Sequence, residues 1–513
     1  MSTLAKLRVG FRRPIDWLDG FLDSITSYRL LLYVLLAILG TGVWGSLLGE
    51  VSFTWQHILL SAGCLALVCW LVNRAWARAL DVPTNKHSEL ITALILTLVL
   101  TPGQTYRDYL ILAAAAAMAM SSKYILAFRR SHVFNPAAVG AFSVGAAFSY
   151  HASWWVGTTF LTPVVLAGGI LILRKMKRFR MVLIFLAVYV GWLIWRLHTG
   201  TNSSIVAHVV WLSLSATPAL FFAVVMLVEP LTSPARRYLS YAVLVSVLYS
   251  VPSLHFAPEE ALLIGNLLTA IIEPHPRWRL RLIKRVNEAR GITSYLFKPS
   301  LAFKFKPGQY LEWTLPGAKS DARGNRRYLT ISASPTESHL MFTIRQPARS
   351  SAFKARLKKL PLGHNILASH LAGSFTLPKK TEPKLVFIAG GVGITPFRSI
   401  IKYLIDTKDR RDITLLYAAD AAQEFAFTSL FKKAEAVGLK TFFTLTAEPK
   451  PAGWRGRHGR IDAVMIKKLV PDYKQRRFYV SGPYGLVRAV RDELFKLGVK
   501  PRRIKTDYFP GYG

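Results

Sequence analysis

Two kinds of hydrophobic pattern divide the 513-residue chain near residue 277. Before this point, apolar residues gather in stretches such as "LLLYVLLAILGTGVWGSLLG", and about twenty such residues cross a hydrocarbon layer of about 30 Å. Ten spans are predicted, near residues 28–48, 56–73, 89–101, 108–121, 134–150, 158–173, 181–196, 205–228, 239–252 and 259–272. We therefore expect residues 1–276 to form a polytopic α-helical membrane domain.

Beyond residue 277 the period of the pattern changes. Strings such as "GITSYLFKPS" and "HLMFTIRQ" alternate apolar and polar residues between prolines and glycines, which predicts an antiparallel β-barrel over residues 277–383. From residue 384 strand patterns such as "KLVFIAGG" alternate with helical patterns such as "SIIKYLIDT". That order is typical of an α/β doubly wound parallel sheet, which we assign to residues 384–513.

Charge and cysteine content narrow the class of protein to which the chain can belong. The 66 Lys and Arg exceed the 28 Asp and Glu, which alone would allow a nucleic-acid partner. Around the ten predicted spans, Lys and Arg nevertheless fall mainly at one set of ends, which is the asymmetry of cytoplasmic loops. We therefore expect a multi-pass protein of the cytoplasmic (inner) membrane with both termini in the cytoplasm, the lipid bilayer as partner and no nucleic acid. Two cysteines provide neither a disulfide framework nor a four-cysteine metal cluster, and no metal is predicted.

The string "GGVGITP" follows a buried strand pattern and opens a helix, an arrangement suited to a pyrophosphate. With "PGQY" at 307–310, "RYLT" at 327–330 and "YVSGPYG" at 479–485, residues 280–513 resemble the ferredoxin reductase superfamily. The resemblance implies FAD on the barrel and a pyridine nucleotide on the sheet.

The resemblance assigns flavin contacts to the "RYLT" string. Arg327 would neutralise an FAD phosphate, and Thr330 would hydrogen-bond near flavin N5 as one of two catalytic residues. Leu329 stands where the family has the aromatic residue that stacks on the flavin ring, although Tyr328 and Arg326 allow a shift of one residue.

The resemblance implies nucleotide contacts in two strings. In "GGVGITP" the contacting residues are Gly390, Gly391, Gly393, Thr395 and Pro396, and in "YVSGPYG" they are Ser481, Gly482 and Pro483. Ser481, the other catalytic candidate, stands where the family often has a cysteine beside the nicotinamide, so we expect hydride transfer to rely on positioning more than on a thiol.

Other positions carry single roles in the same resemblance. Ser350 and Ser351 fall where a hydroxyl contacts the FAD pyrophosphate. Asp420 follows a strand where an acid would accept from ribose hydroxyls and repel a 2'-phosphate, which favours NADH, with NADPH possible. At the end of the chain, Tyr508 or Phe509 would cover the flavin.

Strings in the membrane half resemble a second family. "HSELITALILTLVLTPG", "SHVFNPAAVGAF" and "LSATPALFFAVVMLVEPLTSP" are similar, in order, to segments of the flavin-carrying membrane proteins of the sodium-translocating NADH:quinone reductase (NQR-B) and of the Rnf complex (RnfD). This family carries flavin in the membrane, including FMN esterified to threonine in a Ser-x-Ala-Thr type motif. The tripeptide that ends in Thr217 aligns with a different family segment, which argues against covalent attachment.

A non-covalent FMN or other flavin is therefore expected near Asn135, Thr158, Thr159 and Thr217. Asn135 before Pro136 is equally well interpreted as a helix cap. Haem is the competing carrier, but no predicted span offers two histidines stacked along its length.

Together these features predict a membrane flavoprotein that oxidises NADH and passes electrons through FAD to a membrane flavin. The final acceptor would be a quinone or an extracytoplasmic electron carrier. Two alternatives stay open: a redox-coupled Na+ or H+ transporter, with Glu89 and Glu229 as candidate acids, and a membrane sensor with a degenerate reductase domain.

Overall fold

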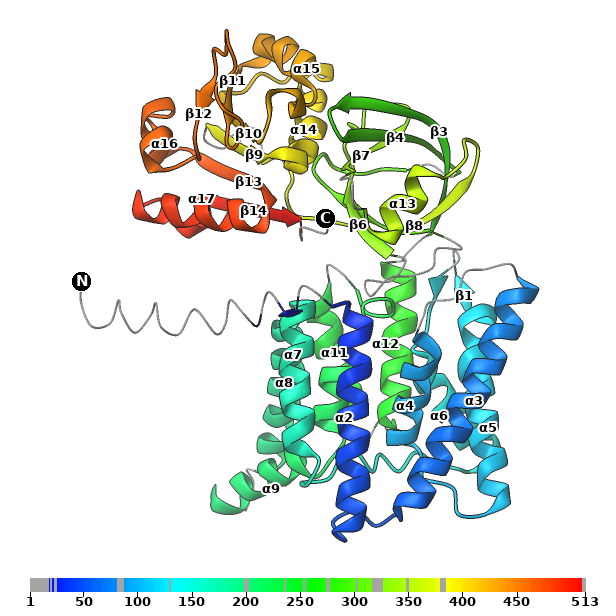
Figure 1. Cartoon of the computed structure of the whole chain (residues 1–513). Coiled ribbons are helices and arrows are strands. Elements are labelled where there is room, and N and C mark those ends of the chain that lie inside the picture. Colours follow the sequence, from blue (N-terminus) through cyan, green and yellow to red (C-terminus); the bar gives the residue numbers. More distant parts are fainter. Residues whose placement is uncertain are drawn as a thin grey trace. The chain divides into compact units, whose positions relative to one another are not determined.

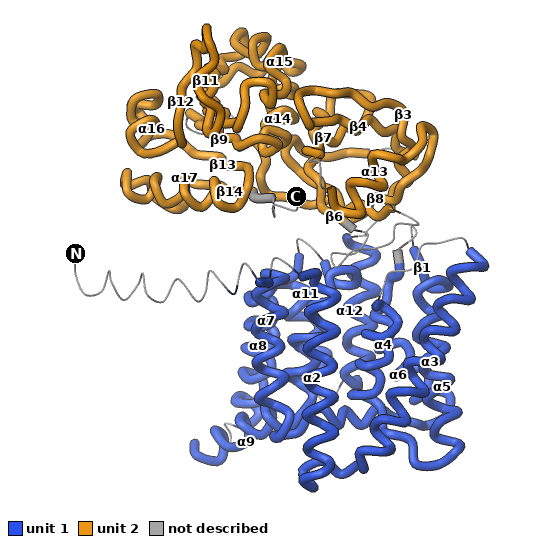
Figure 2. The backbone as a smooth tube through the Cα atoms, in the orientation of Figure 1, with its two compact units in different colours: residues 1–276 blue, residues 277–513 orange. Residues whose placement is uncertain are grey.

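The computed structural model divides into two compact units, residues 1–276 and 277–513 (Figure 2). The structure describes residues 18, 21–22, 25–80, 87–128, 131–197, 203–234, 237–251, 254, 256–273, 277–300, 303–315, 326–346, 350–378 and 384–509.

Unit 1 is a bundle of helices (Figure 1). They are α2 (Ser27–Leu47), α3 (Trp55–Ala79), α4 (Ser88–Val99), α5 (Tyr106–Ile125), α6 (Pro136–Phe148), α7 (Thr162–Met176), α8 (Phe179–Leu197), α9 (Ser203–Ser215), α10 (Ala219–Phe221), the π-helix η1 (Phe222–Met226), α11 (Tyr238–Ser250) and α12 (Pro258–Ile272). A two-stranded ribbon joins β1 (Ala127–Phe128) to β2 (Ser131–His132). Each of the ten predicted stretches therefore contains helix.

The number of membrane spans differs from the prediction of ten. Among the described residues, three helices are long and apolar enough to cross a membrane: α2, α3 and α8. A fourth candidate is the pair Ser203–Ser215 and Ala219–Met226, which is bent by 57°. Apolar helices such as α4, with 12 residues, rise only about 18 Å at about 1.5 Å per residue. Hydropathy alone does not distinguish such a short, buried helix from a span.

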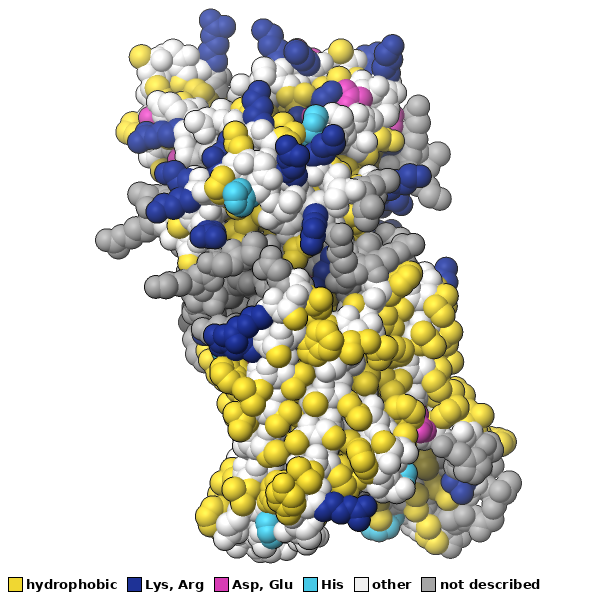
Figure 3. Space-filling view, turned by 90° about the vertical axis from the view of Figure 1, so that its right-hand side faces the viewer, with side chains coloured by type: hydrophobic (Ala, Val, Ile, Leu, Met, Phe, Trp, Pro, Cys, Tyr) yellow, Lys and Arg dark blue, Asp and Glu magenta, His cyan; other side chains and the backbone are white. Residues whose placement is uncertain are grey.

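Many large apolar side chains are exposed on unit 1 among the described residues. Figure 3 shows hydrophobic side chains covering one of its faces. Large side chains are exposed on both long helices α3 and α8, including Leu60 at 60%, Leu183 at 61% and Trp195 at 67%. A helix that is apolar on its outward face needs an apolar environment, so this surface suits association with a membrane.

Unit 2 begins with a six-stranded antiparallel half-barrel. Its strands are β3 (Trp278–Ala289), β4 (Ile292–Pro299), β5 (Tyr310–Thr314), β6 (Arg326–Thr330), β7 (Leu340–Arg345) and β8 (Asn365–Ala372), in the order β6-β5-β8-β3-β4-β7. The helix α13 (Ala352–Lys358) lies between β7 and β8 in sequence. The edge strands approach each other where Ser332 N donates to Met341 O at 2.8 Å. The predicted antiparallel barrel is confirmed.

The second part of unit 2 is a six-stranded parallel sheet in the order β12-β11-β10-β9-β13-β14. The strands are β9 (Leu385–Gly390), β10 (Ile413–Ala419), β11 (Leu439–Leu445), β12 (Arg457–His458), β13 (Arg477–Pro483) and β14 (Ile504–Phe509). The helices are α14 (Thr395–Asp406), α15 (Thr428–Lys433), α16 (Ala463–Leu469) and α17 (Tyr484–Lys496). The predicted doubly wound sheet is confirmed, and its strand order reverses between β9 and β13.

Candidate functional site

The reversal between β9 and β13 positions the nucleotide candidates. In a doubly wound sheet the crevice for a ligand lies outside the carboxyl ends of the strands at this point. Strand β9 ends at Gly390, a short 3-10 turn spans Gly391–Ile394, and α14 starts at Thr395. The adjacent strand β13 ends in Ser481, Gly482 and Pro483. The two predicted strings are therefore brought together at one edge of the sheet.

Glycine is required in the turn because two backbones touch. A Cβ at Gly393 would lie 2.4 Å from the carbonyl oxygen of Ser481 and 2.5 Å from Cα of Gly482. Gly391 adopts a φ of +53°, and a Cβ there would meet nothing within 4 Å. The turn is therefore packed against β13 on one side and has an open backbone on the other, where a pyrophosphate could approach.

Thr395 and Pro396 have structural partners. Both residues are buried, and Thr395 Oγ1 donates to the carbonyl oxygen of Val392 at 3.1 Å. Pro396 occupies the first turn of α14, where its missing N–H needs no acceptor. The geometry thus explains "TP" as the start of the helix that presents its N-terminus to the crevice.

Ser481 is the buried polar residue of this edge. Its side chain has 0% exposure, and its Oγ has no hydrogen-bond partner within the described part of the chain. A buried hydroxyl without a partner costs free energy, so a ligand that offers a donor or acceptor would be favoured here. An amide-bearing nicotinamide fits this requirement.

Strand β6 separates the flavin candidates onto two faces. Arg327 pairs with Trp313 and Leu329 with Leu311, and Leu329 packs against the barrel core. Tyr328 and Thr330 face the other way; Tyr328 is 57% exposed, whereas Thr330 is only 6% exposed. The side chain accessible to a flat external ligand is therefore Tyr328 and not Leu329.

Tyr310, from the "PGQY" string, lies on the same face as Tyr328. The two rings meet edge to face with centroids 5.6 Å apart. Burial, and then the charge of Asp507, raises the pKa of Tyr310. The phenol is consequently neutral at physiological pH and can donate a hydrogen bond.

The predicted phosphate contacts converge on α13. Ser351 is buried and caps this helix, accepting from Lys354 N at 3.4 Å, while Ser350 is exposed. The guanidinium of Arg327 lies 5.2 Å from the ring centroid of Phe353, in the first turn of α13. Strand β6 and the α13 N-terminus thus bring a cation and two hydroxyl groups to one part of the barrel.

Asp420 follows β10 at the same carboxyl edge. Its side chain is exposed; Oδ1 accepts from Thr446 Oγ1 at 2.8 Å, and Oδ2 lies 3.6 Å from Arg345 Nη1. Arg345, which sequence reasoning missed, also pairs with Glu424 at 2.8 Å. The carboxylate is therefore held in one orientation by two neighbours.

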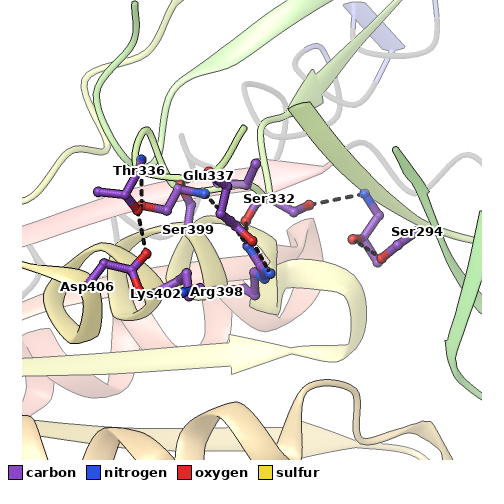
Figure 4. A network of polar contacts seen from close by, with 11 residues as sticks. Ser294, Ser332, Thr336, Glu337, Arg398, Ser399, Lys402 and Asp406 are labelled. Carbon is purple, nitrogen blue, oxygen red and sulfur yellow. Dashed lines mark hydrogen bonds and ion pairs between the residues drawn. The ribbon is translucent and has the colours of Figure 1, made fainter. Parts of the chain in front are cut away.

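Sequence reasoning also missed the residues that join the barrel to α14. Arg398, two residues beyond Pro396, pairs with Glu337 of the β6–β7 connection (Figure 4). The signal in the sequence was an isolated Arg within a helix pattern, and nothing in that pattern names its distant partner.

Phe509 ends strand β14, where its backbone pairs with Pro483. The side chains of Tyr508 and Phe509 lie outside the described residues. The flavin-covering role therefore stays a prediction.

The membrane-domain candidates occupy two places in unit 1. Asn135 caps α6, accepting from Ala138 N at 3.1 Å, and its Nδ2 donates to Glu229 at 2.8 Å.

The second place is the break before α10, where Thr217 Oγ1 donates to Ser213 O at 2.5 Å. The helical segment 219–226, on the order of 10 Å long, runs between Thr217 and Glu229. Thr158, whose buried Oγ1 lacks a partner among the described residues, follows Gly157, which packs on Thr217.

Comparison with known proteins supports the assignment of unit 2. Residues 387–492 match the family of the oxidoreductase NAD-binding domain. The chain is 29% identical over 244 residues to the stachydrine N-demethylase reductase subunit Stc4 of Rhizobium meliloti, covering 45% of this chain and 67% of that protein. It is 28% identical over 262 residues to a flavohemoprotein of Pseudomonas putida, covering 48% of this chain and 64% of that protein. The chain thus matches about two thirds or less of the length of these relatives.

Solved structures give weaker likenesses. The cytochrome P450 reductase GcoB of Amycolatopsis aligns with a TM-score of 0.42 and 23% identity, over 47% of this chain and 72% of that one. The FAD/NAD-binding domain of nitric oxide dioxygenase from Vibrio cholerae aligns with a TM-score of 0.40 and 20% identity, over 45% of this chain and 98% of that one. With the sheet topology and the family match, unit 2 is a ferredoxin reductase-like FAD/NAD(P) module. The family match and these relatives support an NAD(P)H-dependent oxidoreductase activity for unit 2.

Proposed function

We propose that unit 2 takes a hydride from NADH onto FAD and that the electrons leave singly for a carrier in unit 1. The observation that carries this proposal is the meeting of the Gly390–Gly393 turn with Ser481 at the strand-order reversal. FAD, when bound, accepts two electrons with the hydride and releases them one at a time.

On the sheet, the chain binds and orients the nucleotide. The open backbone of the turn and the N-terminus of α14 attract the pyrophosphate of NADH. Ser481 Oγ would offer its unused hydrogen-bonding capacity to the nicotinamide amide. A Cβ at Gly482 would lie 3.2 Å from backbone atoms of Gly390, so this glycine lets the ends of β13 and β9 pack closely.

On the barrel, we assign to Tyr328 the stacking role of the family's aromatic residue, whose place in the motif Leu329 occupies. Its exposed ring lies on the face that also carries Thr330 and Tyr310. Arg327 and the hydroxyl groups at the start of α13 would neutralise and bind the FAD phosphates, as the resemblance implies.

Asp420 favours NADH over NADPH in this scheme. A carboxylate held by Thr446 and Arg345 can accept from the ribose hydroxyls and repels a 2'-phosphate. The nearby Arg345 moderates that repulsion, so the preference is expressed as a ratio of efficiencies and not as exclusion of NADPH.

Unit 1 receives the electrons in this proposal. We assign it to the inner membrane as a flavin-carrying domain with cytoplasmic termini, because its surface is apolar and its strings resemble NQR-B and RnfD. The acceptor beyond it is a quinone or an extracytoplasmic carrier. Fusion to unit 2 keeps the electron donor at a high effective concentration.

Ion transport coupled to the electrons is the second candidate function. Glu229, at the end of a helical segment, accepts from Asn135 Nδ2 at 2.8 Å and lies 3.8 Å from His132. Glu89 of α4 accepts from Asn73 at 3.3 Å. Polar and ionisable residues of this kind inside a membrane domain commonly mark an ion or proton path.

An anaerobic titration of the detergent-purified chain tests the function of unit 2. Stoichiometric NADH should bleach the flavin absorbance near 450 nm, as expected for reduction of FAD, and NADPH should do so with lower efficiency. A chain that purifies with FAD and is reduced by dithionite but not by either coenzyme would contradict the proposal.

A further inference from the structure

A network of polar contacts joins the two halves of the proposed site (Figure 4). Arg398 of α14 forms a two-pronged pair with Glu337, in which Nη2 donates to Oε1 at 2.9 Å. The same guanidinium donates through Nη1 to the carbonyl oxygen of Ser332 at 3.1 Å. Next to it, Ser399 Oγ donates to Ala333 O at 2.5 Å. We call the Arg398–Glu337 pair with these two backbone contacts the latch.

The latch is continuous in sequence with both halves of the site. Ser332 comes two residues after Thr330, at the end of the flavin strand β6. Arg398 comes two residues after Pro396, on the helix that follows the nucleotide turn. Only two positions in sequence therefore separate each contact from the group whose place it would set.

The latch is also largely buried, and further hydrogen bonds hold its members. The side chain of Arg398 is 12% exposed and that of Glu337 is 26% exposed, and Ser332 and Ser399 are fully buried. Glu337 is itself held by Ser334 N, which donates to Oε2 at 2.6 Å. Ser332 Oγ accepts from Thr343 N of β7 at 3.1 Å, and Thr343 contacts Ser294 of β4 at 2.7 Å. A planar guanidinium fork bound to a carboxylate fixes direction as well as distance.

We propose that Arg398 is a positioning residue that sets the separation between the flavin ring on β6 and the nicotinamide at the β9–β13 edge. This inference rests on the proposed function of unit 2. Arg398 acts through the backbone of 332–333 and need not touch either cofactor. Since hydride transfer requires close approach of the reacting atoms, a misplacement of about 1 Å costs about 100-fold in rate.

The test replaces the planar guanidinium of Arg398, once by lysine, which keeps the positive charge, and once by glutamine, which does not. In Arg398→Lys and Arg398→Gln, flavin reduction at saturating NADH should slow by about tenfold to 100-fold, with FAD content and NADH affinity changed less than about threefold. The absorbance change of the flavin on binding a tetrahydro analogue of NADH, which cannot give a hydride, should also weaken. This second readout reports ring proximity without turnover.

Arg476→Lys is the matched control. Arg476 is a similarly buried arginine paired with Asp412 and Asp472, but it lies at the amino ends of the strands, away from the site. It should lower the melting temperature without slowing flavin reduction. The reversed pair Arg398→Glu with Glu337→Arg should recover part of the rate lost in either single variant.

The proposed role of Arg398 is overturned if flavin reduction in Arg398→Lys and Arg398→Gln proceeds at the wild-type rate, or slows only in proportion to the FAD that is lost. It is equally overturned if Arg476→Lys slows reduction as much. Failure of the proposed function looks different, because the unmodified chain would then bind FAD without being reduced by NADH.

Discussion

Ser481 shows how one side chain connects packing to chemistry. Its hydroxyl is fully buried and unpaired within the described residues, so it contributes nothing to stability that Ala would lose. Ser481→Ala should therefore leave the melting temperature unchanged or slightly higher. If the hydroxyl binds the nicotinamide, the rate of flavin reduction should fall by about tenfold, roughly the worth of one neutral hydrogen bond.

Stopped-flow reduction of the flavin by NADH, set beside a melting curve for the same preparation, measures both effects. Thr441→Ala is a control because Thr441 Oγ1 is also buried without a partner in the described structure, but within strand β11. A large drop in melting temperature with unchanged kinetics would assign Ser481 to the core.

Residue roles were predictable where the signal is local. The glycines of "GGVGITP" could be recognised because a turn before a helix uses neighbours in sequence, and Asn135 could be recognised as a cap for the same reason. The orientation of β6 could not be fixed, because "RRYLT" is compatible with either alternation and the choice depends on partners in β5. Arg398 and Arg345 escaped notice because their partners lie 61 and 75 or more residues away.

At the scale of elements, the turn between β9 and α14 depends on contact between two backbones. Gly393→Ala would place a Cβ 2.4 Å from Ser481 O, an atom that cannot move aside as a flexible side chain can. We expect a loss of about 1–3 kcal/mol in the free energy of unfolding and weaker NADH binding. Denaturant unfolding and NADH titration measure these effects.

Gly485→Ala, on the neighbouring helix α17, is the control for Gly393→Ala and should not lower the stability. A Cβ at Gly485, in the first turn of α17, meets nothing within 4 Å. Because Ala favours helix over Gly, this variant should be neutral or more stable by up to about 1 kcal/mol. Equal losses in both variants would show that backbone contact is not what excludes a side chain at Gly393.

A second prediction at this scale concerns the amino ends of the strands. The hydrogen bond from Arg476 Nε at 2.6 Å, helped by Lys384, lowers the pKa of Asp472. A carboxyl whose pKa is lower in the folded chain stabilises it above the unfolded pKa of about 3.9, and this contribution disappears as pH falls through the folded value. Asp472→Asn should therefore melt below the unmodified chain at pH 7.

The difference in melting temperature should shrink toward zero as pH falls below the unfolded pKa of about 3.9 and on through the lower folded value, because the Asp472 carboxyl then becomes protonated in the folded chain too. Calorimetry across this range measures it. Asp492→Asn is the control, because the Asp492 side chain is 40% exposed and lies 3.6 Å from Arg491; this variant should melt like the unmodified chain at pH 7. A gap that persists undiminished at low pH would contradict the electrostatic explanation.

Elements at the boundary of the two units were the hardest to predict. The segment "RWRLRLIKR" is strongly basic, yet from Trp278 onward it forms β3, with Trp278, Leu280 and Leu282 buried and Arg279 and Arg281 exposed. Strand β14 lies at a position for which the sequence predicts only aromatic residues near the flavin. Both strands depend on distant partners, β8 and β13, so their sequences alone do not reveal pairing.

For the whole molecule, the distribution of charge changes the meaning of the net +38. Residues 277–513 carry 46 Lys and Arg against 17 Asp and Glu, so most of the excess belongs to unit 2 and not to the loops of unit 1. A strongly basic module attracts anions, which include nucleotide coenzymes and acidic lipid headgroups. The basic loops still orient unit 1 in the proposal, but they account for the smaller share.

The arrangement of two units in one chain leads to a prediction about cofactor content. A layer of about 30 Å is too thick for a single electron hop, so a route across it needs a centre inside unit 1. The detergent-purified full chain should contain two flavins, both bleached by NADH, and acid precipitation should release both. Residues 277–513 expressed alone should contain one FAD, still be reduced by NADH, and no longer sediment with membranes. Full-length protein with FAD alone, and no other prosthetic group, would leave the reductase intact but remove the membrane flavin from the pathway.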